Sequence, residues 1–233
     1  MKYIGISKNN LLLKKDTQGG YTMKVIAING SPHQNGNTAY AMGIIAEELK
    51  KEGIETEIIT IGKETIHGCL GCGRCYREHD EKCIFEDDIV NEIFQKVKEV
   101  DGIILGSPVH YAGMGGVMGT FLDRLFYMNG ANGNVLRHKV GVAVAAVRRS
   151  GGIPAVNQMS KYLEYSEMVI PTSNYWNVIH GLKSGDAEQD EEGKQVMRVL
   201  GKNMAWIMKV IEAGRDKVTE PEEERKQMTN FIR

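Results

Sequence analysis

The sequence predicts an α/β fold in which one parallel sheet of five strands carries helices on both faces. Short β-branched apolar runs alternate with segments whose apolar residues recur every three or four positions, as strands alternate with helices. Residues 102–106 and 140–147 are apolar throughout, as expected of central parallel strands covered on both faces. Glycine supplies 27 of the 233 residues, or about 12% against a usual value of about 7%, and many glycines follow these runs.

The first strand, helix and second strand follow directly from the hydrophobic pattern. Residues 24–29 form a β-branched apolar run, and a glycine-rich loop follows it. The next apolar positions have helical spacing, and they are Met42, Ile45, Ala46 and Leu49. Gly53 ends that helix, and residues 54–61 alternate between polar and apolar side chains as a second strand does.

Helices and strands continue to alternate in the second half of the chain. Residues 87–88 are both Asp and mark a helix start, because acidic side chains favour the positive end of the helix dipole. The buried stripe of this helix is Val90, Ile93, Phe94 and Val97. We expect helices over residues 116–128 and 154–165, and a fifth strand over residues 168–171. A long last helix ends near Gly214, with an apolar face of Val196, Leu200, Met204, Ile207 and Ile211.

This order of elements predicts a flavodoxin-like three-layer sandwich with strand order 2-1-3-4-5. Right-handed crossovers place helices on both faces, and the ligand crevice lies at the carboxyl ends of the strands. We therefore expect the site in the loops after strands 1, 3 and 4. Residues 23–213 form the domain, residues 1–22 an N-terminal appendage, and residues 214–233 a charged tail, either a solvated helix or an arm that helps oligomers assemble.

Composition excludes several classes of protein. Hydrophobic residues make up 42% of the chain and charged residues 25%, which is typical of a globular protein and not of a disordered one. Lys and Arg number 29 against 30 Asp and Glu, so there is no basic field for nucleic acid. The longest apolar run, residues 140–147, is far shorter than the roughly 18 residues that span a bilayer. With no signal-peptide pattern at the N-terminus, we expect a cytoplasmic protein without membrane or nucleic-acid partners.

The loop after strand 1 is suited to a phosphate group. Residues 29–38 are rich in Gly and Asn and lead directly into a helix, where backbone N–H groups and the helix dipole favour an anion. Residues 25–49 contain no Lys or Arg, so a phosphate would be held by amides with Ser31, Asn37 and Thr38. The alternative is a simple turn in which Asn37 or Thr38 caps the helix.

Two further loops approach the same edge of the sheet. Residues 107–116 follow strand 3, and their small side chains permit a flat ring to lie against the backbone. His110 and Tyr111 could line the edge or face of that ring. Residues 148–152 follow strand 4 and add glycines and two Arg side chains.

All four cysteines lie in one 15-residue stretch with the spacing C-x2-C-x2-C-x7-C. They are Cys69, Cys72, Cys75 and Cys83, within an insert at residues 67–86. Three thiolates two residues apart and a fourth from a loop suit a 4Fe-4S cluster, whose negative charge Arg74, Arg77 and Lys82 would offset. The alternatives are a four-thiolate zinc site, four reduced and unligated thiols, or a thiol–disulfide relay such as that of Cys72 with Cys75.

Several stretches together resemble a known family. They are residues 24–32 (KVIAINGSP), 36–38 (GNT), 106–111 (GSPVHY) and 122–124 (LDR). These closely resemble the flavodoxin-like NADPH-dependent FMN reductase family over residues 23 to 213, and the cysteine pattern is similar to that of the iron–sulfur flavoproteins. The chain departs from the family at Gly119, where relatives often carry Lys.

The resemblance implies FMN, with its phosphate on Ser31, Asn37 and Thr38 and its isoalloxazine along residues 108–113. The expected flavin-binding residues are Ser31, His33, Asn35, Asn37, Thr38, Ser107, Pro108, Val109, His110, Tyr111, Ala112, Gly113, Arg149, Ser150, Gly151 and Gly152. His110 and Tyr111 are the candidates if a side chain acts as acid or base. The resemblance also implies a homodimer or homotetramer.

We therefore expect an FMN-dependent oxidoreductase. With a cluster, a one-electron donor such as a ferredoxin-like protein reduces the 4Fe-4S centre, and electrons pass to FMN and on to an acceptor. Without a cluster, NAD(P)H reduces the flavin, and a quinone, free flavin or other small acceptor takes the electrons. Two other functions stay open, a flavodoxin-like electron carrier without its own substrate and a cofactor-free binding module.

Overall fold

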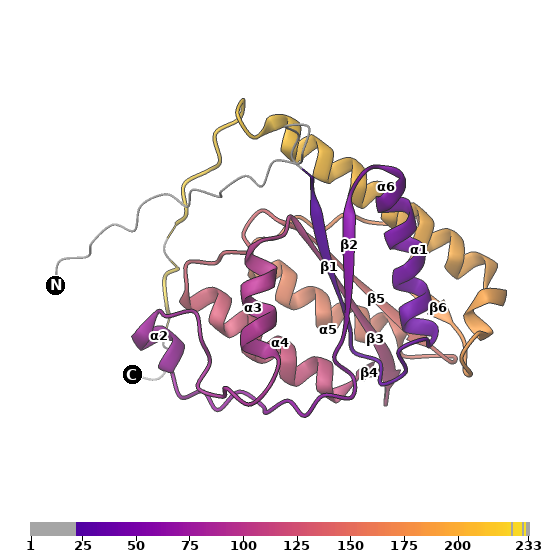
Figure 1. The fold of residues 1–233 in the computed structure, drawn as a ribbon, viewed down its shortest axis with the longest axis horizontal. Coiled ribbons are helices and arrows are strands. Elements are labelled where there is room, and N and C mark those ends of the chain that lie inside the picture. The colour runs from indigo at the N-terminus through magenta and orange to yellow at the C-terminus, as the bar shows by residue number, and fades with distance from the viewer. Residues whose placement is uncertain (1–21, 225, 230, 232–233) are drawn as a thin grey trace.

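The computed structural model describes residues 22–224, 226–229 and 231 and has a central sheet between two layers of helices (Figure 1). The parallel strands are β1 (Lys24–Asn29), β2 (Glu55–Thr60), β3 (Gly102–His110), β5 (Val140–Val147) and β6 (Val178–His180). Their order is β2-β1-β3-β5-β6, and the short β4 (Gly113–Met114) pairs antiparallel with β3. The predicted three-layer fold is confirmed, and β4 is an addition that shifts the numbering of the later strands.

Two separate apolar cores lie on the two faces of the sheet. One contains α1 (Asn37–Lys51) and α6 (Glu191–Gly214), which pack on Val25 and Ala27 of β1. The other contains α3 (Val90–Lys98) and α4 (Gly116–Ala131) with α5 (Gly152–Tyr165), which pack on Ile26 and Ile28. Successive side chains of a strand point to opposite faces, so this one strand supplies apolar side chains to both cores.

The predicted fifth strand at residues 168–171 is wrong. Only Val169 in that stretch pairs with the sheet, through an isolated parallel bridge to Val140. Pro171 follows two residues later and has no N–H to continue a ladder. The fifth parallel strand is instead β6, which pairs with the carboxyl-terminal half of β5.

The other helices lie close to their predicted positions. The carboxylate of Asp88 accepts a hydrogen bond from the backbone N–H of Val90 at 3.1 Å, which agrees with the helix start expected at residues 87–88. A short helix α2 (Arg74–Glu78) lies within the cysteine-containing insert, and a 3-10 turn η1 (Asp186–Gln189) precedes α6. None of the helices that the structure describes is long and apolar enough to cross a membrane.

The described part of the charged tail is an extended arm that contacts the domain. Arg137 donates a hydrogen bond to the carbonyl oxygen of Pro221 at 3.2 Å, and the ammonium of Lys226 lies 3.3 Å from the ring centroid of Tyr165. No helix follows Gly214 among the tail residues that are described. The predicted N-terminal appendage, apart from Thr22, lies outside the described residues.

Candidate functional site

The loop between β1 and α1 is folded on itself by hydrogen bonds. The backbone N–H of Ser31 donates to the side chain of Asn29 at 3.0 Å, and the N–H of His33 donates to the Ser31 hydroxyl at 3.2 Å. The N–H of Gly36 then donates to the carbonyl oxygen of His33 at 3.0 Å. Ser31 is buried, whereas His33 and Asn35 are exposed. The loop is therefore a compact turn that ends at the first residue of α1.

The amino-terminal end of α1 has no capping side chain among the described residues. Its cap position is Gly36, and its first turn contains no acidic residue. The N–H groups of Asn37, Thr38 and Ala39 donate to no described acceptor. The alternative turn capped by Asn37 or Thr38 is thus not what the structure contains. Free N–H groups at the positive end of a helix dipole attract an anion such as phosphate.

Gly62 brings a second backbone segment against this loop. A Cβ atom at residue 62 would lie 2.1 Å from the carbonyl carbon of Ser31. The N–H of Ile61 also donates to the carbonyl oxygen of Asn29 at 2.9 Å. Only glycine permits this contact, so the position of the loop depends on a residue that the sequence did not single out.

Residues 181–187 close over the same loop from a distant part of the chain. The side-chain amide of Asn37 donates to the carbonyl oxygen of Lys183 at 2.9 Å and accepts from the N–H of Ala187 at 3.3 Å. The hydroxyl of Ser184 donates to the carbonyl oxygen of Asn35 at 2.7 Å. The side chain of Asn37 therefore fastens this segment, whereas the sequence predicted it as a phosphate ligand. No local sequence signal connects Lys183 with a loop 146 residues earlier.

The loop after β3 is a tight hairpin. The strand continues past the end of β1 to His110 and returns as β4, with His110 paired to Gly113. Tyr111 and Ala112 form the turn and have φ angles of +49° and +61°, the left-handed values that a two-residue type I′ turn requires. Residues other than glycine adopt such values at a cost of about 1–2 kcal/mol each. The ring of Tyr111 is fully exposed at the tip.

Two polar side chains hold the hairpin in place. The Ser107 hydroxyl accepts from the N–H of Gly115 at 2.8 Å and donates to the carbonyl oxygen of Pro108 at 2.9 Å. Gln158 of α5 accepts from the N–H of Met114 at 2.9 Å. The predicted flavin residue Ser107 is fully buried, and its hydroxyl is already bonded within the protein.

The turn after β5 packs against the hairpin. Gly151 has φ of +90°, and a Cβ atom on it would lie 2.6 Å from the Cα atom of Ala112. Arg149 and Ser150 are exposed beside it, and Gly152 is buried at the start of α5. The N–H of Gly30 also donates to the carbonyl oxygen of Gly106 at 2.8 Å, which joins the first loop to β3. The three predicted loops therefore meet at the carboxyl edge of the sheet (Figure 1).

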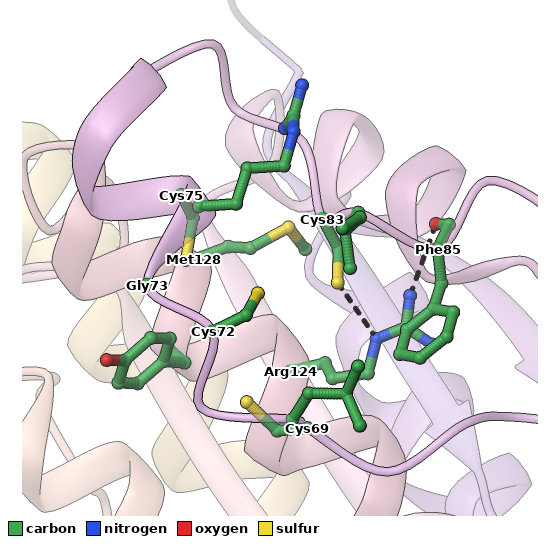
Figure 2. A pocket seen from close by; sticks show the side chains of 12 residues that line it. Cys69, Cys72, Gly73, Cys75, Cys83, Phe85, Arg124 and Met128 are labelled. Atoms are coloured by element: carbon green, nitrogen blue, oxygen red, sulfur yellow. Dashed lines mark hydrogen bonds between the residues drawn. The ribbon is translucent and has the colours of Figure 1, made fainter.

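The four cysteines line one pocket, as Figure 2 shows. Cys75 lies on α2 and is buried, Cys83 is half-buried, and Cys69 and Cys72 are exposed. Burial raises the pKa of the Cys75 thiol above its usual value. The other lining residues include Leu70, Ile84, Phe85, Tyr127 and Met128. Within the described part of the chain, no three His, Cys, Asp or Glu side chains form a ready site for a single metal ion.

Arg124 of α4 is the charged centre of the cysteine pocket. The residue is only 1% exposed, and its Nε–H donates to the sulfur of Cys83 at 3.3 Å (Figure 2). One Nη pairs with the buried Asp88, and the other donates to the carbonyl oxygen of Phe85 at 3.4 Å. Burial opposes its charge, but the Asp88 carboxylate and the Cys83 sulfur raise the net pKa of Arg124 above its usual value.

The three cations expected to balance cluster charge lie in the same insert as the cysteines, and Arg74 lines the pocket, but none of them donates to a described cysteine sulfur. Arg74 forms two hydrogen bonds with the carboxylate of Asp80, at 2.9 and 2.6 Å, and Arg77 donates to the carbonyl oxygen of Cys72 at 2.7 Å. Lys82 is exposed. Sequence reasoning missed the role of Arg124 in the pocket, although it had noted residues 122–124 as a motif.

Helix α4 connects the two sites. It begins at Gly116 beside the hairpin and contributes Arg124 and Met128 to the cysteine pocket. At a helical rise of about 1.5 Å per residue, Arg124 lies about 12 Å along the axis from Gly116. One rigid element therefore fixes the separation of the loop site and the cysteine pocket within a single chain.

Comparisons with known proteins show which family and fold the chain is similar to. The family described as NADPH-dependent FMN reductase matches residues 23–183. The chain is 38% identical to iron-sulfur flavoprotein MJ1083 of Methanocaldococcus jannaschii, over 81% of this chain and 99% of that protein. It is 29% identical to an iron-sulfur flavoprotein of Methanosarcina thermophila, over 84% and 100%. Among solved structures, a flavodoxin from the domain Archaea has a TM-score of 0.54 and 19% identity, covering 80% of this chain and 99% of that one, which supports the fold.

Proposed function

The chain belongs to the NADPH-dependent FMN reductase family, in its iron–sulfur flavoprotein branch, and from this we propose the route that electrons take through this FMN-dependent oxidoreductase. They enter from a one-electron donor such as a ferredoxin-like protein. They then pass through a 4Fe-4S cluster to FMN and leave to a small-molecule acceptor. The observation that carries this proposal is the gathering of all four cysteines around one pocket.

The loop site fits FMN. Free N–H groups at the start of α1, with the Ser31 and Thr38 side chains, suit the phosphate. The hairpin at residues 108–113 and the turn at residues 149–152 offer backbone and small side chains against which a flat ring can lie. FMN exchanges electrons singly or in pairs, so it can join a one-electron donor to a two-electron acceptor. His110 and Tyr111 are exposed at this edge and are the candidates for proton transfer.

The cysteine pocket fits a thiolate-ligated cluster. Cys69 and Cys72 precede α2, Cys75 lies on it and Cys83 follows it in a separate loop, an arrangement suited to holding a group from several sides. The buried guanidinium of Arg124 supplies positive charge and an N–H donor to Cys83. Positive charge and hydrogen bonds to sulfur stabilise the reduced form of such a cluster, and Arg124 offers both.

A second candidate function is direct reduction by NAD(P)H. The observation in its favour is the pair Arg148 and Arg149, which are exposed beside the hairpin and form no ion pair with any described residue. Two such guanidinium groups can bind the phosphates of a nicotinamide nucleotide. In this case the four cysteines would not be needed for turnover.

The route is tested by reducing the flavin anaerobically with two donors, a reduced ferredoxin and NADPH. Wild type is compared with Cys72→Ser, which removes one exposed cysteine side chain of the pocket. We expect reduction by ferredoxin to be at least tenfold slower in Cys72→Ser, with the FMN content unchanged. Equal rates in both proteins with NADPH, and no reduction of either by ferredoxin, would favour the second candidate. Reduction without steady-state turnover of any small acceptor would indicate an electron carrier.

A further inference from the structure

We propose that Arg124 raises the reduction potential of the cluster by donating its Nε–H to the sulfur of Cys83, and that Asp88 is the positioning residue for this guanidinium. The inference rests on the proposed function, because it requires a cluster in the cysteine pocket. It assigns a role to the most deeply buried charged side chain of the described residues.

The four sulfurs of the pocket have unequal surroundings. Only the sulfur of Cys83, among the described residues, accepts a hydrogen bond from a side chain. The donor atom, Nε of Arg124, lies 3.3 Å from it, and the Arg124 side chain has no exposed surface. Water therefore does not compete for this N–H group, and the bond is stronger than it would be at the surface.

The guanidinium is held from every side. Asp88 pairs with one Nη, and the same Nη donates to the carbonyl oxygen of His67 at 3.3 Å. The other Nη donates to the carbonyl oxygen of Phe85, whose ring centroid lies 5.0 Å from the guanidinium carbon. Because these partners hold both Nη atoms, the orientation of the guanidinium is fixed, and its Nε–H points toward Cys83. Partners of this kind fix the geometry of a ligand beyond its direct metal bond.

The acceptor is fixed independently of the donor. Asn91 of α3 accepts from the backbone N–H of Cys83 at 2.7 Å, and its amide donates to the carbonyl oxygens of Cys83 at 3.3 Å and Phe85 at 2.9 Å. Arg124 comes from α4, so two helices position the two ends of one N–H to sulfur hydrogen bond. The fourth cysteine is therefore held at both its backbone and its sulfur.

The effect on the potential follows from charge. A one-electron donor adds one negative charge to the cluster and its thiolates, and no bond is made or broken and no proton is transferred. An N–H group and a positive charge beside a sulfur stabilise the more negative, reduced form more than the oxidised form. Arg124 therefore favours reduction and makes the cluster a better acceptor for the donor protein.

The test compares two matched double variants. Arg124→Met/Asp88→Asn removes the pocket's buried ion pair as a unit, because removing Arg124 alone would leave an unpaired buried carboxylate. Arg74→Met/Asp80→Asn removes another Arg–Asp pair that borders the same pocket and donates to no sulfur. In a potentiometric titration followed by EPR, we expect the first to lower the ratio of reduced to oxidised cluster about tenfold at a fixed potential, a shift of about 59 mV. We expect Arg74→Met/Asp80→Asn to shift the reduction potential far less.

The outcomes separate the inference from the proposed function. Wild-type protein without iron and sulfide would overturn the proposed function itself. Iron-loaded wild type, with both double variants titrating alike, would overturn only the role of Arg124. Should the first variant not fold, wild type labelled with ¹⁵N-arginine supplies the test. The reduced cluster should then show a hyperfine coupling to an arginine nitrogen, and its absence would contradict the hydrogen bond.

Discussion

The side-chain amide of Asn37 donates to the carbonyl oxygen of Lys183 at 2.9 Å and so joins the first turn of α1 to the segment before α6. This contact brings Lys183 beside the loop between β1 and α1. Residues 25–49, which include that loop, contain no Lys or Arg. Lys183 is exposed and forms no ion pair with a described residue. In the folded chain a distant segment therefore brings a lysine to a loop that contains no Lys or Arg of its own, and we expect the ammonium group of Lys183 to attract the flavin phosphate.

Lys183→Met should weaken FMN binding about threefold to tenfold and leave riboflavin binding unchanged, because only FMN carries the phosphate charge. The effect should shrink as salt is added. Fluorescence titration of the apoprotein with both flavins measures it. Lys202→Met is the control, since Lys202 is an exposed lysine on α6. An equal loss of riboflavin affinity would show that Lys183 acts on the fold of the segment and not on the phosphate.

Gly62→Ala should distort the loop at residues 29–38, where we expect the flavin phosphate to bind. The new methyl group would lie 2.1 Å from the carbonyl carbon of Ser31, so one of the two backbones has to move. We expect a loss of about 1–3 kcal/mol in the free energy of unfolding, with FMN affinity reduced more than tenfold. Chemical denaturation and FMN titration measure the two effects.

Gly43→Ala is the matched control for this substitution. Gly43 lies within α1, and a Cβ atom there would meet nothing within 4 Å. The change should raise the free energy of unfolding by about 0.5–1 kcal/mol, since alanine favours a helix. If both alanine variants behave alike, the close approach of Gly62 does not define the loop.

The hairpin turn makes a separate prediction about Tyr111. The side chain of Tyr111 is fully exposed, so a substitution there changes the free energy of unfolding through the backbone, whose φ angle is +49°. Tyr111→Asn should keep the melting temperature within a degree or two of wild type, because Asn tolerates left-handed angles. Tyr111→Val should lower the free energy of unfolding by about 1 kcal/mol or more. If the ring of Tyr111 covers the flavin, both variants should also lose turnover, and turnover unaltered in Tyr111→Asn would rule out that role.

Lys139 gives the protein a distinctive dependence on alkaline pH. Burial lowers the pKa of Lys139 from 10.5 to about 8, although Asp101 and Glu99 oppose the shift. Between these values the folded protein has released a proton that the unfolded chain still holds. The free energy of unfolding therefore rises with pH across that window. Below about pH 8 it is lowered by the full cost of burying the charged ammonium.

We expect the difference in free energy of unfolding between wild type and Lys139→Met to move in favour of wild type by about 2 kcal/mol from pH 8 to pH 10. Urea denaturation at several pH values measures it. The same difference for the exposed Lys202→Met should stay flat. A flat difference for Lys139→Met as well would mean that the two carbonyl oxygens at the end of α3, those of Val97 and Lys98, keep its ammonium charged when folded.

The fold was predictable where local patterns decide it. The β-branched run at residues 24–29 is β1, and the acidic start at residues 87–88 leads into α3. The fifth strand was misplaced because residues 168–171 are as apolar as a strand. Which segment pairs along β5 is decided only in the assembled sheet, and there residues 178–180 form the paired strand. Strand pairing is a property of distant segments and leaves little trace in local composition.

The candidate site was predictable as a set of loops, but not in its internal contacts. The four cysteines line one pocket, since four closely spaced residues have few ways to be far apart, and the cluster they were predicted to hold stays a prediction. The sequence did not indicate that Asn37 would bond to Lys183, or that Arg124 would reach Cys83. Both contacts join residues that lie far apart in the chain and become neighbours only when the sheet and its helices are assembled.

The central claim is that the four cysteines hold a 4Fe-4S cluster beside FMN. Its most direct test is the content of iron, acid-labile sulfide, zinc and FMN per chain in protein purified without oxygen, with visible spectra before and after dithionite. The account predicts about four iron and four sulfide per FMN, and absorbance that dithionite bleaches in both the cluster and flavin regions. FMN with negligible iron and sulfide, even after anaerobic reconstitution, would contradict it.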